Sequence, residues 1–218
     1  MIVGPKGAGK TSLARRWAKG YARVMWVDPS GCEPQTRAMK VHTSAESVKR
    51  ALMFQNVGHI HLDCSIMSAS EVDESVGVLE WRGGPRTLLV LEEYRLLVGD
   101  RKSRTSFPRL QGLLRLARHH NLDVAVISHD VRDVPPDVLA TVDTFVAFGP
   151  VGEQTRRYIQ AQYGRSAASA VQGLDSAGTC TYPDYVGDRV VMEAPERWTA
   201  LRRETVGISH SLADERRD

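Results

Sequence analysis

The chain opens with Met1-Ile-Val-Gly4-Pro-Lys-Gly-Ala-Gly-Lys10-Thr11, in which residues 4–11 follow the pattern G-x-x-x-x-G-K-T. Glycines in such a loop let consecutive backbone N–H groups point inward at one anion, because a Cβ would obstruct the turns. Lys10 supplies a charge for the β- and γ-phosphates, and the Thr11 hydroxyl can bind Mg²⁺. Residues 12–20 are predicted to form a helix whose positive N-terminal end faces the phosphates.

This phosphate-binding loop predicts a site for a nucleoside triphosphate. The alternative, a glycine-rich turn that only joins a strand to a helix, explains neither the lysine nor the threonine. The predicted nucleotide-binding residues are Gly4, Pro5, Lys6, Gly7, Ala8, Gly9, Lys10, Thr11 and Ser12.

Length and composition limit the remaining possibilities. The 218 residues are enough for one α/β domain with a core and too few for two comfortable ones. The formal net charge of +3 is mild, so affinity for nucleic acid must come from local clusters. Cys32, Cys64 and Cys180 form no C-x-x-C pair, which favours a reduced, cytoplasmic protein. No apolar run has the length of a membrane span, so we expect no transmembrane segment.

Apolar runs alternate with helical patterns along the chain, which predicts an α/β fold with a mostly parallel sheet and helices on both faces. Strands are predicted at 23–28, 38–42, 59–63, 87–91, 122–127 and 144–148, and helices after 43 and 68, at 110–120, after 135 and at 153–163. Only three residues precede Gly4, so the first strand is very short or the polypeptide begins upstream. We assign 1–163 to a core, 164–201, with a candidate strand at 189–192, to an extension packed on it, and 202–218 to a disordered tail.

Two acids follow the most apolar predicted strand, 87–91, in the manner of a Walker B segment. The carboxyl ends of parallel strands are where ligands bind in such sheets. Glu92 is therefore assigned to the magnesium shell and Glu93 to polarising the attacking water. Asp63, at the end of another strand, is the second candidate for magnesium, and a solvated acidic turn is the alternative for the pair.

Further polar residues are candidates for the chemistry. His129 follows the strand at 122–127 and either senses the γ-phosphate and the attacking water or is an ordinary loop histidine. Arg115 and Arg118 are three apart and project from one helix face. Across a subunit boundary, such an arginine accelerates hydrolysis by roughly 10³–10⁵. A solvated basic face is the alternative.

A polar loop at 99–106 carries three positive charges, which suit contact with nucleic-acid phosphates without sequence readout, or a merely solvated loop. The predicted DNA-binding residues are Arg101, Lys102 and Arg104. His59, His61 and Asp63 alternate along one strand, but nothing completes a zinc ligand set with the usual spacing, so we expect no metal there.

The run from Arg115 to His129, the pair Val134-Pro135 and the segment 142–148 resemble the FtsK/HerA superfamily of DNA-translocating ATPases. Together with Val27-Asp28-Pro29 and the early phosphate-binding loop, they are most similar to the small genome-packaging ATPases of membrane-containing icosahedral viruses. The resemblance spans about residues 1–163. It departs from the family at two positions, since Gln usually stands where His129 does and Asp often stands where Glu92 does.

The resemblance implies a RecA-like core, a homo-oligomeric ring, commonly a hexamer, and hydrolysis of ATP with Mg²⁺ between subunits. It further implies transport of double-stranded DNA into a capsid at a vertex or portal protein, in the host cell cytoplasm or at the virion. By position, Lys10 and Thr11 bind phosphate and magnesium, Glu93 is the catalytic acid, His129 is the sensor, and Arg115 or Arg118 is the arginine finger.

Two other functions are compatible with the same loop. A small-molecule kinase of the P-loop class fits the length, although no acceptor-site signature is visible. A nucleotide-gated assembly or export ATPase is the third candidate, and its relatives generally carry a membrane-spanning segment.

Overall fold

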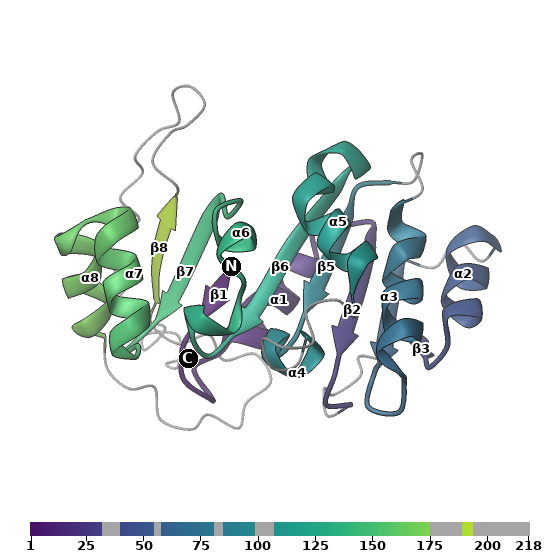
Figure 1. The fold of residues 1–218 in the computed structure, drawn as a ribbon, viewed down its shortest axis with the longest axis horizontal. Helices are drawn as coiled ribbons and strands as arrows, with labels where there is room; N and C mark the ends of the chain where they lie inside the picture. The colour runs from purple at the N-terminus through teal and green to yellow at the C-terminus, as the bar shows by residue number, and fades with distance from the viewer. Residues whose placement is uncertain (32–39, 55–57, 81–84, 99–106, 175–188, 194–218) are drawn as a thin grey trace, which may run out of the picture.

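A mostly parallel β-sheet forms the centre of the molecule (Figure 1). The computed structural model describes residues 1–31, 40–54, 58–80, 85–98, 107–174 and 189–193. Within these residues the strands are β1 (Ile2–Val3), β2 (Arg23–Asp28), β3 (Lys40–His42), β4 (His59–Asp63), β5 (Thr87–Leu91), β6 (Leu122–Ser128), β7 (Thr144–Phe148) and β8 (Arg189–Glu193). In this described part they form one eight-stranded sheet in the order β3-β4-β2-β5-β6-β1-β7-β8. Neighbouring strands are parallel except β7 and β8, so the predicted mostly parallel sheet is confirmed.

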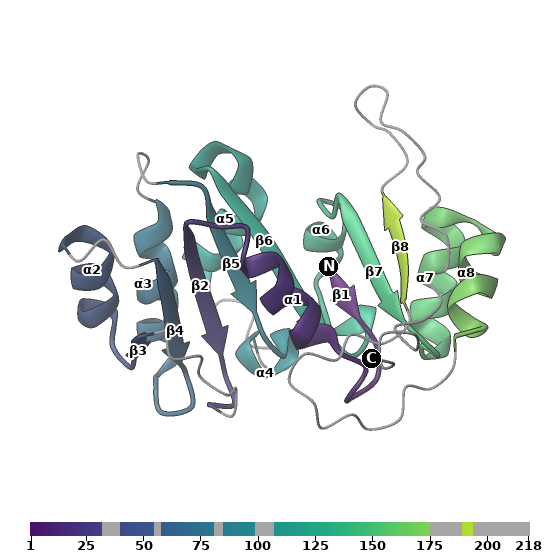
Figure 2. The same cartoon turned by 180° about the vertical axis from the view of Figure 1, so that it is seen from behind.

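Helices connect the strands and cover both faces of the sheet. They are α1 (Lys10–Ala18), α2 (Ala45–Phe54), α3 (Ala69–Gly77), α4 (Tyr94–Val98), α5 (Pro108–Leu116), α6 (Pro136–Leu139), α7 (Glu153–Tyr163) and α8 (Arg165–Gln172), with 3₁₀ turns η1 (Val78–Glu80), η3 (Ala117–His120) and η4 (Val131–Asp133). Figure 1 shows α3 and α5 in front of the sheet, and Figure 2, from behind, shows α1 on the other face. The prediction of helices on both faces is confirmed.

The central strands are apolar on both sides because each side packs against helices. In β2, Met25 and Val27 belong to the core cluster that includes residues of α3 and α5. Val24 and Trp26 belong to the second cluster, to which α1 contributes Leu13. A strand buried on both faces reads as a continuous apolar run, which is the pattern that made these strands recognisable in the sequence.

The structure differs from the sequence predictions in several segments. The helix predicted at 110–120 is α5 followed by η3, and it ends at Asn121, whose φ of 54° lies in the left-handed region. The sequence did not predict α4 or α8. In α8 only Ala168 and Val171 are buried, so small side chains leave a weak apolar signal. The candidate strand at 189–192 is β8, which pairs antiparallel with β7.

The proposed boundaries at 163 and 201 remain predictions, and 202–218 lies outside the described residues. Among the residues that the structure describes, no helix has both the length and the apolar character that crossing a bilayer requires.

A carboxylate of α3 completes the N-terminus of α5. The N-cap residue of α5 is Phe107, whose side chain caps nothing. Instead, Asp73, only 6% exposed, accepts hydrogen bonds from the backbone N–H groups of Arg109 at 3.2 Å and Leu110 at 2.9 Å. The first N–H groups of a helix have no partner within the helix, so this long-range cap fixes where α5 begins against α3.

We expect Asp73→Ala to lower the free energy of unfolding by about 1–3 kcal/mol, because it leaves buried N–H groups without an acceptor. Urea unfolding followed by circular dichroism measures this change. Glu74→Ala, at the exposed neighbouring position of α3, is the matched control and should change stability by less than about 0.5 kcal/mol. Equal effects of the two substitutions would contradict the capping role.

Candidate functional site

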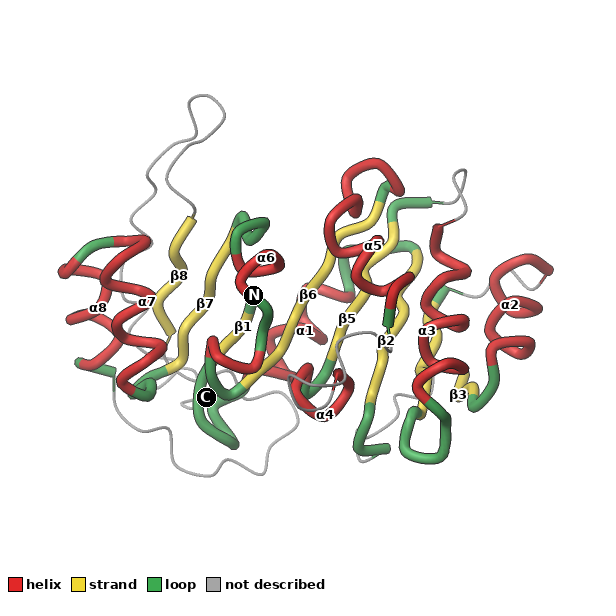
Figure 3. Tube along the Cα trace, in the orientation of Figure 1, coloured by secondary structure: helices red, strands yellow, loops and turns green. Residues whose placement is uncertain are grey.

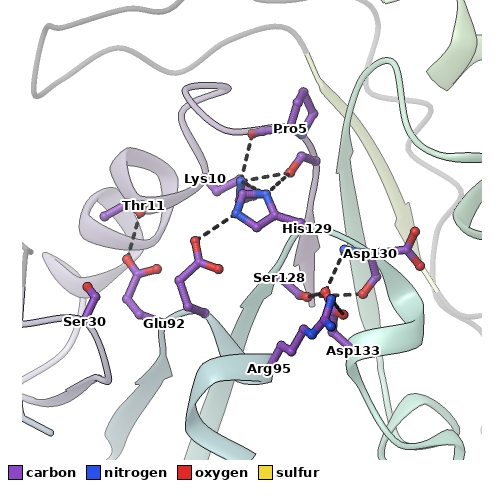
Figure 4. Close-up of polar contacts among 12 residues, drawn as sticks. Pro5, Lys10, Thr11, Ser30, Glu92, Arg95, Ser128, His129, Asp130 and Asp133 are labelled. Atoms are coloured by element: carbon purple, nitrogen blue, oxygen red, sulfur yellow. Dashed lines mark hydrogen bonds and ion pairs between the residues drawn. The ribbon is translucent and has the colours of Figure 1, made fainter. Parts of the chain in front are cut away.

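The strand order brings the ends of β1, β5 and β6 together at one edge of the sheet. Val3, the last residue of β1, pairs with Ser128, the last residue of β6. On the other side of β6, Leu91 at the end of β5 pairs with Val126. The loop after β1, the acids after β5 and the histidine after β6 therefore converge, as Figure 4 shows. Figure 3 shows loops along this edge, below the strands.

The loop between β1 and α1 has the backbone conformation of an anion-binding loop. Gly4, Gly7 and Gly9 have φ values of 154°, 79° and 91°. A Cβ on Gly4 would lie 2.7 Å from Phe148 Cβ and 2.8 Å from Phe148 O, so the close approach to β7 requires glycine. Gly9 is the N-cap of α1, and the first turn holds no acidic residue. The first turn of α1 thus carries no carboxylate of its own at its positive end, which fits a bound phosphate.

Lys10 is a buried cation at the centre of this loop. Its side chain is 7% exposed, and Nζ donates to the carbonyl oxygens of Gly4 at 2.9 Å and Pro5 at 2.8 Å. Burial lowers the pKa of Lys10 to about 8, and the nearby carboxylates of Glu93 and Glu92 act in the opposite direction. A phosphate would add negative charge beside the ammonium and so favour its charged form.

Thr11 and Glu92 form the second polar contact of the site. The Thr11 hydroxyl donates to Glu92 Oε1 at 2.7 Å, and Glu92 is 5% exposed. The two side chains join the start of α1 to the end of β5 and supply hard oxygen atoms. Oxygen ligands of this kind are those that Mg²⁺ prefers, so the residues present fit the ion.

Glu93 and His129 form the third contact. His129 Nε2 lies 2.9 Å from Glu93 Oε1, and His129 Nδ1 lies 3.1 Å from Gly4 O. Both ring nitrogens face acceptors, which the doubly protonated imidazole satisfies best. The hydrogen bond to Glu93 raises the pKa of His129, and the same bond lowers the pKa of Glu93. Lys10 Nζ, 3.4 Å from Nδ1, opposes the charge on the ring.

Glu93 also has an unusual backbone conformation. Its φ of 41° is positive, which is uncommon for a residue other than glycine. It stands between β5 and α4, so the chain turns sharply there. Strained residues of this kind cluster at functional sites, where the surrounding structure holds them in place.

The other predicted site residues lie elsewhere. Arg115 stands near the end of α5, just before the start of β6, and its Nη2 donates to Asp137 Oδ2 at 2.6 Å. The seven residues of β6 stand between Arg115, which precedes the strand, and His129, which follows it. Asp63 accepts from Ser65 N and Oγ in its own turn, and β2 separates its strand from β5. The side chain of Arg118 lies outside the described residues, as do the whole residues Arg101, Lys102 and Arg104.

Ser128 and Asp133 are not among the site residues predicted from the sequence. Ser128, which directly precedes His129, donates through its Oγ to Asp133 Oδ2 at 2.7 Å (Figure 4). Asp130 and Asp133 form a capping box around η4. An acidic residue three positions after an N-cap residue is a recognisable signal of such a box.

Solved structures of other proteins share this fold. The genome packaging NTPase B204 from Sulfolobus turreted icosahedral virus 2 in complex with AMPPCP gives a TM-score of 0.66 at 15% identity, over 88% of this chain and 90% of that chain. The same protein in complex with ATP-gammaS gives 0.61 at 16% identity, over 88% and 89%. The pCW3 conjugation coupling protein TcpA with ATPgS gives 0.51 at 14% identity, over 88% of this chain and 56% of that chain. No model of a protein family and no curated protein matches the sequence.

At these identities the likeness concerns the fold, and it confirms the expected RecA-like α/β P-loop NTPase fold. It also confirms, at the level of the fold, the expected resemblance to genome-packaging ATPases of icosahedral viruses.

We expect Gly4→Ala to destabilise the protein by about 1–3 kcal/mol and to weaken binding of a non-hydrolysable ATP analogue, because the new Cβ overlaps Phe148. Gly112→Ala is the control: nothing lies within 4 Å of the added Cβ, and removal of a helical glycine should stabilise α5 by about 0.4–1 kcal/mol. Thermal unfolding and calorimetric titration measure both effects. Unchanged affinity and stability in Gly4→Ala would rule out the close packing of this loop on β7.

Proposed function

We propose that this chain is an ATPase that moves double-stranded DNA, as a motor that packages a viral genome. The observation that carries the proposal is the convergence of Lys10, Glu93 and His129 at the end of three neighbouring strands. A phosphate-binding loop alone binds a nucleotide, whereas hydrolysis also needs an acid that directs water and a group that senses the phosphate. Both accompany the loop here.

Each side chain has a distinct role in the proposed reaction. Lys10 and the N-terminal end of α1 bind the β- and γ-phosphates. Glu93 accepts a hydrogen bond from the attacking water and orients it in line with the terminal phosphate bond. His129, which contacts both Glu93 and the carbonyl of Gly4, would hydrogen-bond the γ-phosphate, so the presence of that phosphate would affect the position of the Glu93 carboxylate. Lys10 is buried, and low exposure to water strengthens its electrostatic contacts.

Thr11 and Glu92 would hold Mg²⁺, Thr11 directly and Glu92 through water. When bound, the ion neutralises charge that develops on the β- and γ-phosphate oxygens. The hydrogen bond between the two side chains already sets their oxygen atoms side by side.

The DNA-moving part of the proposal rests on likeness of fold and on charge. The neighbour B204 is described as a genome packaging NTPase, and its chain length matches this one closely. Arg101, Lys102 and Arg104 would contact DNA phosphates inside a ring of copies, with a capsid vertex or portal protein as the docking partner. The work would take place in the host cytoplasm.

The arginine finger would come from a second copy of the chain. Arg115 precedes β6, whereas His129 of the same chain follows the carboxyl end of that strand. In a head-to-tail ring it would approach the phosphates of the adjacent subunit, after release from Asp137. The other candidate, Arg118, precedes the same strand.

The test is ATP hydrolysis with and without double-stranded DNA, together with a mass measurement of the assembly in solution. We expect DNA to stimulate hydrolysis and nucleotide to favour the oligomer. Glu93→Gln should lower kcat by about 10²–10⁴ while ATP binding persists, because only the water-directing group is lost. Lys10→Ala should lose ATP binding itself.

If the protein is monomeric and its rate of ATP hydrolysis does not change when DNA is added, the proposed motor function is refuted. Phosphate transfer to a metabolite would instead favour a kinase, and tight binding without hydrolysis an export or assembly role.

A mixing experiment addresses the arginine finger. Arg115→Ala and Lys10→Ala should each be inactive alone, yet mixed assemblies should recover part of the activity. In them an intact loop of one subunit meets Arg115 of its neighbour. Arg157→Ala, which removes an exposed arginine paired with Glu153, is the control and should remain active alone. Failure of the mixture to recover activity would exclude Arg115 from this role.

A further inference from the structure

His129 is an exposed member of the candidate site, and its ring is held by two hydrogen bonds, to Glu93 and to the carbonyl of Gly4. Its side chain is 40% exposed, in contrast to buried Lys10 and Glu92. It stands one residue beyond β6, where the sheet no longer fixes the backbone. The direction of this side chain toward Glu93 therefore also depends on the contacts that fix the backbone on each side of it.

One carboxylate oxygen holds both chain neighbours of His129. Asp133 Oδ2 accepts from Ser128 Oγ at 2.7 Å and from the backbone N–H of Asp130 at 3.2 Å. Ser128 precedes His129 and Asp130 follows it, so the backbone on each side is tied to the same atom. Ser128 is 1% exposed and the Asp133 side chain 12% exposed, so water competes little for these bonds. Hydrogen bonds to a carboxylate are about twice as strong as neutral ones.

The position of Asp133 is itself fixed by the turn η4. Asp133 N donates to Asp130 O at 3.2 Å, and the Asp130 side chain accepts from Arg132 N at 2.9 Å. This reciprocal capping box makes residues 128–133 one closed unit. The turn is anchored to the core because Val131 is buried and its N–H donates to Thr155 Oγ1 of α7 at 3.2 Å.

The second oxygen of Asp133 faces Arg95. Arg95 Nη1, on the helix that follows Glu93, lies 3.9 Å from Asp133 Oδ1. The Arg95 side chain is 67% exposed, so solvent screens this ion pair, and the pair alone does little to fix the position of Asp133. Its importance is geometric, since it shows that the turn η4 and the segment after Glu93 lie side by side (Figure 4).

From this geometry we infer that Asp133, acting with Ser128, is a positioning residue that holds His129 against Glu93. Asp133 does not touch the nucleotide in this scheme and acts only through the histidine. The inference rests on the proposed ATP hydrolysis for its catalytic consequence, but the positioning itself is a property of the protein without nucleotide. Ser128 and Asp133 thus have a role that no sequence motif indicates.

A double-mutant cycle tests whether Asp133 acts through His129. In the native background, Asp133→Ala should lower kcat about tenfold and leave KM for ATP within about threefold, because misplaced catalytic groups cost rate rather than binding. Asp133→Asn keeps an acceptor of the same shape and should recover part of the loss. In a His129→Ala background, Asp133→Ala should change kcat by less than about twofold. Equal losses in the two backgrounds would overturn the proposal, since general damage to the fold does not depend on His129.

Ser128→Ala is the second variant, because it removes one of the two bonds with the least change in size and is expected to fold. It should lower kcat in the same direction as Asp133→Ala and by less. Glu153→Gln, which alters an exposed carboxylate paired with Arg156 and Arg157, is the matched control and should leave kcat unchanged. Full activity of Ser128→Ala and Asp133→Ala would also overturn the proposal.

A measurement without nucleotide separates this inference from the proposed function. The ring resonances of His129 are followed by NMR at one fixed pH in protein labelled at histidine. Their chemical shifts should change in Ser128→Ala and Asp133→Ala, and should not change in Glu153→Gln. If the native protein hydrolyses no ATP, the proposed function fails and these resonances still decide the positioning of His129. Resonances that do not respond to either substitution reject the positioning role even in an active enzyme.

Discussion

The burial of one positive charge, on Lys10, is the constraint on which the rest of the site depends. A buried ammonium is costly unless hydrogen-bond acceptors and opposite charges surround it. Here the carbonyls of Gly4 and Pro5 accept hydrogen bonds from its ammonium group, and Glu92 and Glu93 supply negative charge. Those groups follow two strands that are not neighbours, so the environment of this charge depends on the arrangement of the sheet.

The position of β6 between β1 and β5 follows from the same requirement. If the acids stood on the strand directly beside β1, no residue could lie between them and the loop. With β6 inserted, His129 stands at the midpoint, within 3.1 Å of Gly4 O and 2.9 Å of Glu93 Oε1. The histidine thus links the loop that binds phosphate to the acid proposed to direct water. Its two hydrogen bonds give both the Glu93 carboxylate and the Gly4 carbonyl a partner.

Local patterns in the sequence predicted the parts of this site that depend on local geometry. The glycines and Lys10 identify the loop because their spacing is set by one turn of backbone, and Glu92 and Glu93 follow an apolar strand directly. The pairing of His129 with Glu93 joins residues 36 positions apart and depends on strand order, which no short motif expresses. The role of Asp133 could not be predicted for the same reason, because it depends on how η4 packs against the end of β6. The helix α8 was missed because alanine and serine bury little apolar surface.

Two candidate catalytic groups of this chain lie toward opposite ends of β6. Its carboxyl end carries His129 beside the phosphate-binding loop, and its amino end follows Arg115, which is held by Asp137. Groups that must meet in catalysis but stand at opposite edges of one sheet cannot meet within a chain. They can meet only when the amino edge of one copy faces the carboxyl edge of the next, which is a heterologous contact. Contacts of that kind close into rings when the rotation between copies divides a full turn, and the ring that we propose would bring these two groups together.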